Sequence, residues 1–318
     1  MSSMRPKDQE AGQTAEPHVV IVLVNWNGKD DTLACLESLQ NVRYAHKTVV
    51  VVDNGSRDGS VDAIRKRFPD ILLICNERNE RFARANNQGI RIALQQNADY
   101  VLLLNNDTLV DPDFLHHLVR RAESDASIGM VGGKIYYADA PDRLWFAGGG
   151  VDLWRGRIWH YGLRQQDRGQ YNQPRDVDYV TGCCILAKRS CIEAVGGLDE
   201  SYYIYGEDVD WCFRARQAGF RVVYEPEAKI WHKISSSSGG KHAPHAMTGF
   251  KVYHKIRSML TFFRRHARWY HWITLPFGMG LEAIRAAFWL AWHGNWQAIR
   301  AMFRVIVPGR SRADQAGG

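Results

Sequence analysis

The sequence predicts an α/β fold built on a mostly parallel sheet, and three observations lead to that prediction. Short runs of β-branched and apolar residues alternate with segments of helical periodicity, which is typical of consecutive β-α-β units. Three of the early runs end directly in Asn or Asp. The 318 residues are 45% hydrophobic and 24% charged, an ordinary globular composition that excludes intrinsic disorder for most of the chain.

The elements are expected in a regular order. The predicted early strands are Val19–Val24, Thr48–Val52, Ile71–Ile74 and Tyr100–Leu104. Helices are predicted from about Asp31, around Val61, Ile64 and Phe68, and over Ala83–Gln96. Later segments predict a helix over Phe114–Ala122, strands over Gly129–Tyr137 and Val177–Lys188, and a glycine- and tryptophan-rich binding loop over Ala147–Tyr161.

The chain divides by composition into three parts. Residues 1–17 are polar and predict a disordered leader rather than a signal peptide. The run Ser235–Gly240 predicts a flexible break that ends an α/β domain over 18–240. Residues 241–318 carry twelve Lys or Arg against two Asp or Glu, so the formal charge of +7 belongs to this tail.

Two carboxylates follow buried strands at what should be the same edge of the sheet. Asp53 follows four valines, and Asp107 follows a leucine run and two asparagines. Ligands bind at this edge in open α/β sheets, and a carboxylate there costs desolvation unless something ligates it. The structural alternative is that each residue caps the next helix or shapes a turn.

A second acidic group opens a predicted helix. Glu207, Asp208 and Asp210 precede Trp211 within a helical pattern. Acidic residues at a helix start favour the helix dipole, but three exceed that need, and crowded carboxylates have raised pKa values suited to a general base. His232 follows another strand-like run, where a histidine is either a packed core residue or a metal ligand.

Several common classes of enzyme lack their motifs in this chain. It has no G-x-x-x-x-G-K-[ST] loop, no G-x-G-x-x-G at the first turn and no G-x-S-x-G elbow. Acidic strand ends replace the glycine loops of those folds. Phosphates are therefore expected to be held through a divalent cation that bridges carboxylate and diphosphate.

These residues, taken together, resemble the family 2 glycosyltransferases of the GT-A fold, and within them the bacterial rhamnosyltransferase-like branch. The resemblance runs from about Val20 to Ser238. It rests on six motifs in order: Val24-Asn25-Trp26-Asn27-Gly28, Val52-Asp53-Asn54-Gly55-Ser56, Asn79-x-x-Phe82-Ala83-x-Ala85-Asn86-Asn87, Leu104-Asn105-Asn106-Asp107-Thr108, Gly196-Gly197-Leu198-Asp199-Glu200 and Gly206-Glu207-Asp208-Val209-Asp210.

The resemblance implies a site for a nucleotide-diphosphate sugar. Asp53 would accept the N3–H of a uracil or thymine base. The other residues expected to line the nucleotide and sugar site are Asn25, Asn27, Asn54, Asn79, Asn86, Asn87, Asn105 and Asn106.

The resemblance also implies the metal site and the catalytic base. Asp107 would hold Mg²⁺ or Mn²⁺, with His232 as a second ligand, because Asn105 replaces the first Asp of the family's Asp-x-Asp motif. Asp208 matches the base, while Glu207 and Asp210 remain rivals that spacing cannot separate. Trp211 is expected to support the base or contact the acceptor.

The tail predicts a membrane surface as partner. Five of the eleven tryptophans lie among its basic residues, in apolar stretches too short to span a bilayer. The alternative is a helical pair packed on the main domain with a solvated basic face. Nucleic acid is not expected as a partner. Six cysteines without a C-x-x-C pair fit reduced thiols and a cytoplasmic protein at the inner face of the membrane. A homodimer is left open.

The hypothesis from the sequence is an inverting, metal-dependent transfer of rhamnose from dTDP-rhamnose to a lipid-linked saccharide or cell-surface glycan. The alternatives are a UDP-sugar donor carrying galactofuranose or an N-acetylhexosamine, and a non-catalytic sugar-nucleotide-binding scaffold.

Overall fold

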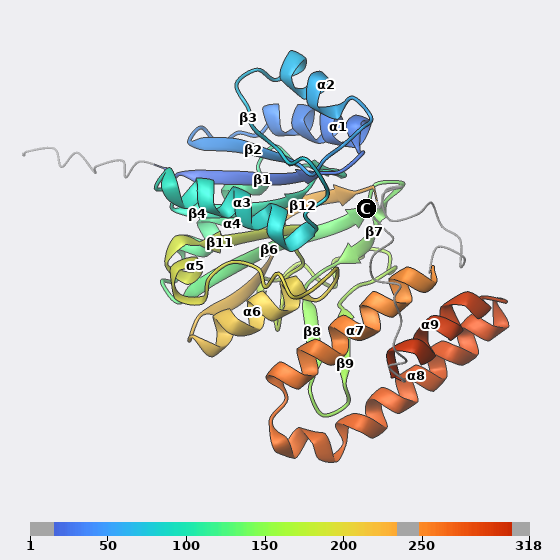
Figure 1. The fold of residues 1–318 in the computed structure, drawn as a ribbon. Helices are drawn as coiled ribbons and strands as arrows, with labels where there is room; N and C mark the ends of the chain where they lie inside the picture. The colour runs from blue at the N-terminus through green and yellow to red at the C-terminus, as the bar shows by residue number, and fades with distance from the viewer. Residues whose placement is uncertain (1–15, 234–247, 307–318) are drawn as a thin grey trace, which may run out of the picture.

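The computed structural model describes residues 16–233 and 248–306. They form one large mixed sheet with helices packed against it, and a group of three long C-terminal helices lies on the side away from α1 and α2 (Figure 1). The sheet runs in the order β10-β12-β6-β11-β4-β1-β2-β3, with β5 paired to β12 and β7 to β6. The predicted α/β class is confirmed.

The strands of the described residues have the following bounds: β1 Val19–Asn25, β2 Lys47–Asp53, β3 Leu72–Cys75, β4 Tyr100–Asn105, β5 Thr108–Val110, β6 Ile128–Tyr137, β7 Ala140–Phe146, β8 Gly149–Asp152, β9 Arg157–His160, β10 Arg175–Asp176, β11 Cys184–Lys188 and β12 Arg221–His232. The helices are α1 Lys29–Gln40, α2 Ser60–Arg67, α3 Phe82–Gln95, α4 Phe114–Glu123, α5 Arg189–Val195, α6 Glu207–Gln217, α7 Gly249–His266, a 3-10 turn η3 Trp269–Ile273, α8 Leu275–Trp292 and α9 Trp296–Ile306.

The first half of the sheet is parallel, as the β-α-β pattern predicts. Strand β1 pairs in parallel with β2 and β4, and β2 pairs in parallel with β3. Residues Val19–Leu23 of β1 have no exposed surface, because helices cover both faces of the sheet here. The continuous valine and leucine runs of the sequence therefore reflect burial on both sides.

One predicted strand is wrong in its first half. Val177–Lys188 was expected to be continuous, but only Cys184–Lys188 forms β11, which pairs antiparallel with β4. The chain turns at Thr181, whose carbonyl accepts the Cys184 N–H, and the Gly182 N–H donates to Asp208 on α6. A bond to a residue 26 positions away holds this turn, so local β propensity could not reveal it.

The expected binding loop at Ala147–Tyr161 is instead a hairpin of β8 and β9. A Cβ atom at Gly149 would lie 2.1 Å from the ring of Tyr179, and one at Gly150 would lie 2.3 Å from Trp159. The glycines are there because aromatic rings pack directly on the strand backbone. The prediction of an irregular loop was wrong for that reason.

The C-terminal tail is helical, and its first helix is docked on the main domain. Phe262 and Phe263 of α7 are fully buried in the large core, and Ser258 Oγ donates to the Ile204 carbonyl at 3.0 Å. Within the ranges that the structure describes, every helix is too short or too polar to cross a bilayer. The expected leader lies mostly outside the described residues, and the expected break at 235–240 lies wholly outside them.

Helix α3 offers a stability test with a matched control. An alanine Cβ at Gly89 would lie 2.3 Å from Val22 Cγ1, whereas one at Gly280 in α8 would meet nothing within 4 Å. Gly89→Ala should lower the free energy of unfolding by about 1–3 kcal/mol through overpacking. Gly280→Ala should raise it by about 0.5–1 kcal/mol through helix propensity.

Urea unfolding of the two variants measures both effects. Shifts of the same sign in the two variants would contradict the packing of α3 on β1.

Candidate active site

The parallel register brings the polar strand ends together. Asn25 lies opposite Asp53 on β2, and Val24 lies opposite Asn105 on β4. Asn25 Nδ2 donates to Asp53 Oδ2 at 2.7 Å. Three of the predicted donor-site residues therefore share the edge at which α/β sheets bind ligands.

Asp53 is a buried carboxylate held by its neighbours. Its Oδ1 accepts the Ser56 N–H at 2.9 Å, and the Ser56 hydroxyl in turn accepts the Asn27 N–H at 2.8 Å. Asp53 does not cap α2: the N-cap residue is Gly59, and the Ser60 N–H donates to Asp58. A carboxylate oxygen accepts more than one hydrogen bond, so Asp53 keeps capacity for a further donor.

Asn54 and Asn79 build the loop beside this edge. Asn54 Nδ2 donates to Asn79 Oδ1 at 2.9 Å, and Asn54 Oδ1 accepts from Asn76 Nδ2 and the Glu80 N–H. The Asn79 oxygen also accepts the Arg81 N–H. These amides are engaged within the loop, so any contact with a donor sugar has to add to those bonds.

Asn86, Asn87 and Asn106 are likewise engaged. Asn86 Nδ2 donates to the Phe82 carbonyl, and Asn87 bonds to both the N–H and the carbonyl of Leu198, which ties α3 to the glycine turn before α6. Asn106 Nδ2 donates to Thr32 Oγ1 at 2.8 Å and to Asn25 Oδ1 at 3.2 Å. Asn106 thus joins the strand-end network, while Asn87 lies at a packing contact.

Asp107 and His232 meet as the metal-site prediction requires. His232 Nε2 lies 3.0 Å from Asp107 Oδ1, and both residues are almost fully buried. Two ligands that stand at adjacent corners of an octahedron, each about 2.1 Å from Mg²⁺, are about 3.0 Å apart. Carboxylate oxygen and imidazole nitrogen at this separation fit one shared divalent cation.

Asp107 and His232 supply two of the ligands that such a cation needs. Within residues 16–233 and 248–306, no group of three or more His, Cys, Asp or Glu side chains is placed to hold a metal. His232 also packs edge-on against Trp145, with ring centroids 4.7 Å apart. His232 can therefore be a packed residue and a metal ligand at the same time.

Helix α6 begins with a strained turn that places its acids. Tyr205 has φ +68°, rare for a residue with a side chain, and Gly206 has φ +88°. Backbone strain of this kind clusters at functional sites. The strained residues are followed directly by Glu207 and Asp208, in the first turn of α6 and beside the Thr181–Cys184 turn.

Asp208 is the acid that faces the strand edge. Its carboxylate accepts the Gly182 N–H at 2.9 Å and the Val209 N–H at 2.8 Å. Burial raises its pKa. The Asn105 N–H donates to the Cys183 carbonyl at 3.0 Å, so the turn whose Gly182 N–H binds Asp208 lies against the end of β4, two residues before Asp107. The structure thus brings the metal-site acid and the predicted base together.

Glu207 has a different environment. Burial and then the Asp208 charge raise its pKa to about 8. Its Oε2 has no hydrogen-bond partner among the described residues. Two adjacent buried carboxyl groups are more stable when they hold one proton between them than when both are ionised. Because Asp208 accepts the N–H groups of Gly182 and Val209, which favour its ionised form, Glu207 keeps the proton and Asp208 carries the charge.

Asp210 cannot be the base in this arrangement. It accepts from Arg214 Nε at 2.7 Å, His266 Nε2 at 2.9 Å and Arg265 at 3.0 Å. Burial opposes ionisation, but the bonds from His266 and Arg214 outweigh it and lower the pKa to about 2. The carboxylate is neutralised and ties α6 to α7.

Trp211 is fully buried, and its Nε1 donates to the Gly196 carbonyl at 2.8 Å. It therefore has no surface to offer an acceptor. Of its two expected roles, only support of the base through the packing of α6 agrees with this position.

Sequence reasoning missed the surroundings of His232. His160 on β9 packs edge-on against Trp145, at 5.0 Å between ring centroids. Burial, followed by the charge of Lys255 on α7, lowers the pKa of His160 to about 4, so its imidazole is neutral. Lys255 was counted with the basic tail, and only the tertiary packing of α7 reveals its place near this site.

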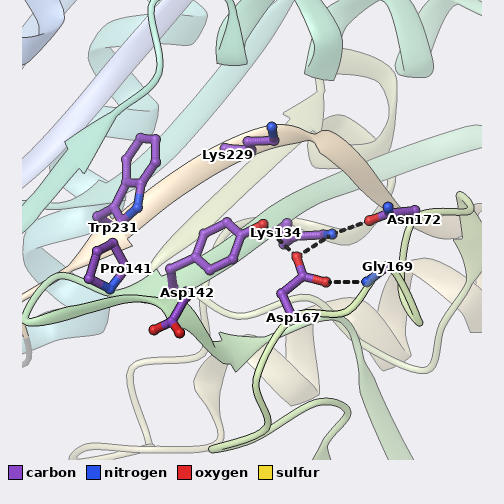
Figure 2. Close-up of a pocket in the computed structure, with 9 residues that line it drawn as sticks. Lys134, Pro141, Asp142, Asp167, Gly169, Asn172, Lys229 and Trp231 are labelled. Carbon is purple, nitrogen blue, oxygen red and sulfur yellow. Dashed lines mark hydrogen bonds and ion pairs between the residues drawn. The ribbon is translucent and has the colours of Figure 1, made fainter.

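A separate cavity of about 470 Å³ lies on the opposite face of the sheet. Figure 2 shows Lys134 inside it, bonded to Asp167 and Asn172. Lys134 on β6 and Lys229 on β12 are register partners, and Lys229 is three residues from His232 along β12, so the side chains of Lys229 and His232 lie on opposite faces of the sheet. Since side chains alternate between faces, this cavity is not part of the Asp107 site, and its buried cation is neutralised internally.

The fold and the acidic edge define a GT-A glycosyltransferase. Residues 17–271 match the family model described as "Glycosyltransferase like family 2", and the chain belongs to this family. It is therefore a glycosyltransferase enzyme, as the sequence predicted.

Relatives and solved structures agree with that assignment. The chain is 28% identical over 254 residues to an N-acetylglucosaminyl-diphospho-decaprenol L-rhamnosyltransferase of Mycobacterium tuberculosis (strain ATCC 25618 / H37Rv), which covers 74% of this chain and 80% of that protein. A poly-beta-1,6-N-acetyl-D-glucosamine synthase of Staphylococcus aureus (strain MSSA476) is 25% identical, over 70% of this chain and 51% of its own. Protein y4gI of Sinorhizobium fredii (strain NBRC 101917 / NGR234) is 29% identical over 74% of this chain, which spans only 26% of that relative.

Two solved structures share the fold. The mannosyltransferase PcManGT from Pyrobaculum calidifontis, in complex with GDP-Man and Mn²⁺, has a TM-score of 0.59 at 18% identity and covers 92% of this chain and 88% of its own. GalNAc-T7 with UDP, GalNAc and Mn²⁺ has a TM-score of 0.56 at 17% identity and covers 77% and 48%.

The ion-pair hub at Asp210 generates a stability prediction. Asp210→Asn removes the carboxylate that Arg214 and His266 share, while Arg265 keeps its pair with Asp199, and should lower the free energy of unfolding by about 3 kcal/mol. Because the folded pKa of about 2 lies below the unfolded value near 3.9, wild-type stability from this group is complete above about pH 4 and is lost as pH falls toward 2.

Thermal unfolding from pH 7 to pH 2 measures both effects. The difference in stability between wild type and Asp210→Asn should shrink on the acid side. A stability difference that stays constant down to pH 2 would show that Asp210 is not an ion-paired carboxylate with a lowered pKa.

Proposed function

We propose that this glycosyltransferase transfers one sugar from a nucleotide-diphosphate donor to a lipid-linked or cell-surface glycan, with inversion at the anomeric carbon. The observation that carries the proposal is the gathering of Asp53, the Asp107–His232 pair and Asp208 at one edge of the sheet. A base-binding acid, a cation site and a proton acceptor are the three groups that the reaction needs.

The donor would lie along the strand ends. Asp53 would accept the N3–H of thymine or uracil, with Asn25 and Ser56 holding its carboxylate in place. Asp107 and His232 would hold Mg²⁺ or Mn²⁺, which when bound would neutralise charge on the leaving diphosphate. Lys255 would add a further positive charge on this side of the molecule.

Asp208 would act as the general base. The acceptor hydroxyl oxygen attacks the anomeric carbon, its proton passes to Asp208, and the bond from that carbon to the diphosphate oxygen breaks. The raised pKa of Asp208 favours proton uptake, and the hydrogen bonds from Gly182 and Val209 fix its orientation.

Rhamnose from dTDP-rhamnose is the preferred donor sugar, supported by the name of the mycobacterial relative, which also names a lipid diphosphate acceptor. The alternative is a UDP-sugar, an N-acetylhexosamine or galactofuranose, and the name of the staphylococcal synthase favours the first of these. Transfer would occur at the cytoplasmic face of the membrane, where a lipid-linked acceptor is exposed.

The two neighbouring acids of α6 give a matched test of the mechanism. Asp208→Asn should lower the rate of transfer by about 100-fold or more, because it removes the proton acceptor, while nucleotide binding stays unchanged. Glu207→Gln should keep the rate within about tenfold, since Glu207 is already protonated. Release of dTDP or UDP from the sugar donor, with and without a lipid-diphosphate saccharide, is the measurement.

Unchanged transfer in Asp208→Asn would remove the base assignment. Loss of equal size in Glu207→Gln would transfer the role to Glu207. Nucleotide binding without any transfer by wild type would favour the scaffold alternative.

A further inference from the structure

An uncovered apolar ridge runs along the C-terminal helices. It consists of seven side chains from η3 and α8, each between 50% and 80% exposed: Trp269, Ile273, Phe277, Leu281, Ile284, Phe288 and Trp292. At 100° per residue the five members in α8 fall within an arc of about 80°, and the helix is about 27 Å long. Exposed apolar surface of this extent marks an interaction site.

The opposite face of α8 is already occupied. Leu290 is buried in a small cluster with Val252 of α7 and with Ala298 and Met302 of α9, and Ala283 and Ala287 pack against that cluster. Leu290 and the two alanines thus face the neighbouring helices, and the members of the ridge face outward. Packing among the described residues leaves the ridge uncovered.

The ridge is fixed to the main domain. Thr274 Oγ1, at the N-cap of α8, donates to the Trp154 carbonyl at 2.7 Å, and Arg157 Nε lies 3.4 Å from Glu282 Oε1. The β8–β9 hairpin therefore contacts α8 at its N-cap and again about two turns further along the helix. Through α7, Arg265 and His266 bond to Asp210 on the helix that carries Asp208. The orientation of the ridge therefore sets the orientation of the active site.

The charges around the ridge identify what covers it. Residues 249–306 contain nine Lys or Arg and a single acid, Glu282. Arg268, Arg285 and Arg300 are exposed beside the ridge or on the adjoining helix α9. A second copy of the chain docked through this face would bring these cations against their own equivalents, whereas an anionic lipid surface would attract them.

We infer that the α8 ridge inserts into the interfacial region of an anionic bilayer, with α8 lying parallel to the membrane plane. Tryptophans at both ends of the ridge, Trp269 and Trp292, suit the headgroup boundary, and the phenylalanines between them would reach the acyl chains. The inference deepens the proposed function: it names the surface that would hold the active site over a lipid-linked acceptor.

The test uses the full-length protein and vesicle flotation. Wild type should float with vesicles of phosphatidylglycerol and phosphatidylcholine, and less with phosphatidylcholine alone. The double variant Phe277→Glu/Phe288→Glu should lose binding by more than about tenfold, since two exposed apolar side chains that would enter the bilayer are exchanged for charges. The control Leu72→Glu/Leu163→Glu adds the same two charges at exposed leucines of the main domain and should float like wild type.

Nucleotide titration of the same variants separates this inference from the proposed function. Unchanged nucleotide binding by Phe277→Glu/Phe288→Glu, with lost flotation, supports the ridge. Wild type that never floats, or floats equally after the double substitution, overturns the inference and leaves the proposed transfer standing. A wild-type dimer in light scattering that the α8 substitutions dissociate would also overturn it, because a second copy would then cover the ridge.

Discussion

The parallel pairing of β4, β1 and β2 is the constraint on which the site depends. In this register the ends of three buried strands reach one edge together, so Asn25, Asp53 and Asn105 become neighbours although they are far apart in sequence. Each acid at that edge is stabilised by a partner that the edge itself supplies. Asp53 is held by Asn25 and Ser56, and Asp107 meets His232 from β12.

Helix α6 shows how position within one turn separates chemically identical groups. Glu207, Asp208 and Asp210 lie within four residues, yet one stays protonated, one is ionised beside the strand edge, and one is locked in ion pairs. The difference comes from what each carboxyl group meets: burial beside the Asp208 charge for Glu207, the N–H groups of Gly182 and Val209 for Asp208, and the ion pairs with α6 and α7 for Asp210. Asp210 also connects the active site with the tail, because two of its partners belong to α7.

The sequence predicts the local and repetitive parts of this protein well. The first four strands lie within one or two residues of their predicted bounds, since continuous apolar runs leave no other place for them. The approach of Asp107 to His232 was suggested only by the family resemblance. The Thr181–Cys184 turn, the burial of Trp211 and the position of Lys255 depend on contacts between distant segments, which no local pattern encodes.

The most direct test of the account is calorimetric titration of the protein with dTDP and UDP, each in the presence of Mn²⁺ and of a chelator, beside the variant Asp107→Asn. The account predicts binding that depends on the metal in wild type and becomes much weaker in Asp107→Asn. Equal affinity with Mn²⁺ and with chelator, or no binding of either nucleotide, would contradict the assignment of the strand edge as a nucleotide-diphosphate site.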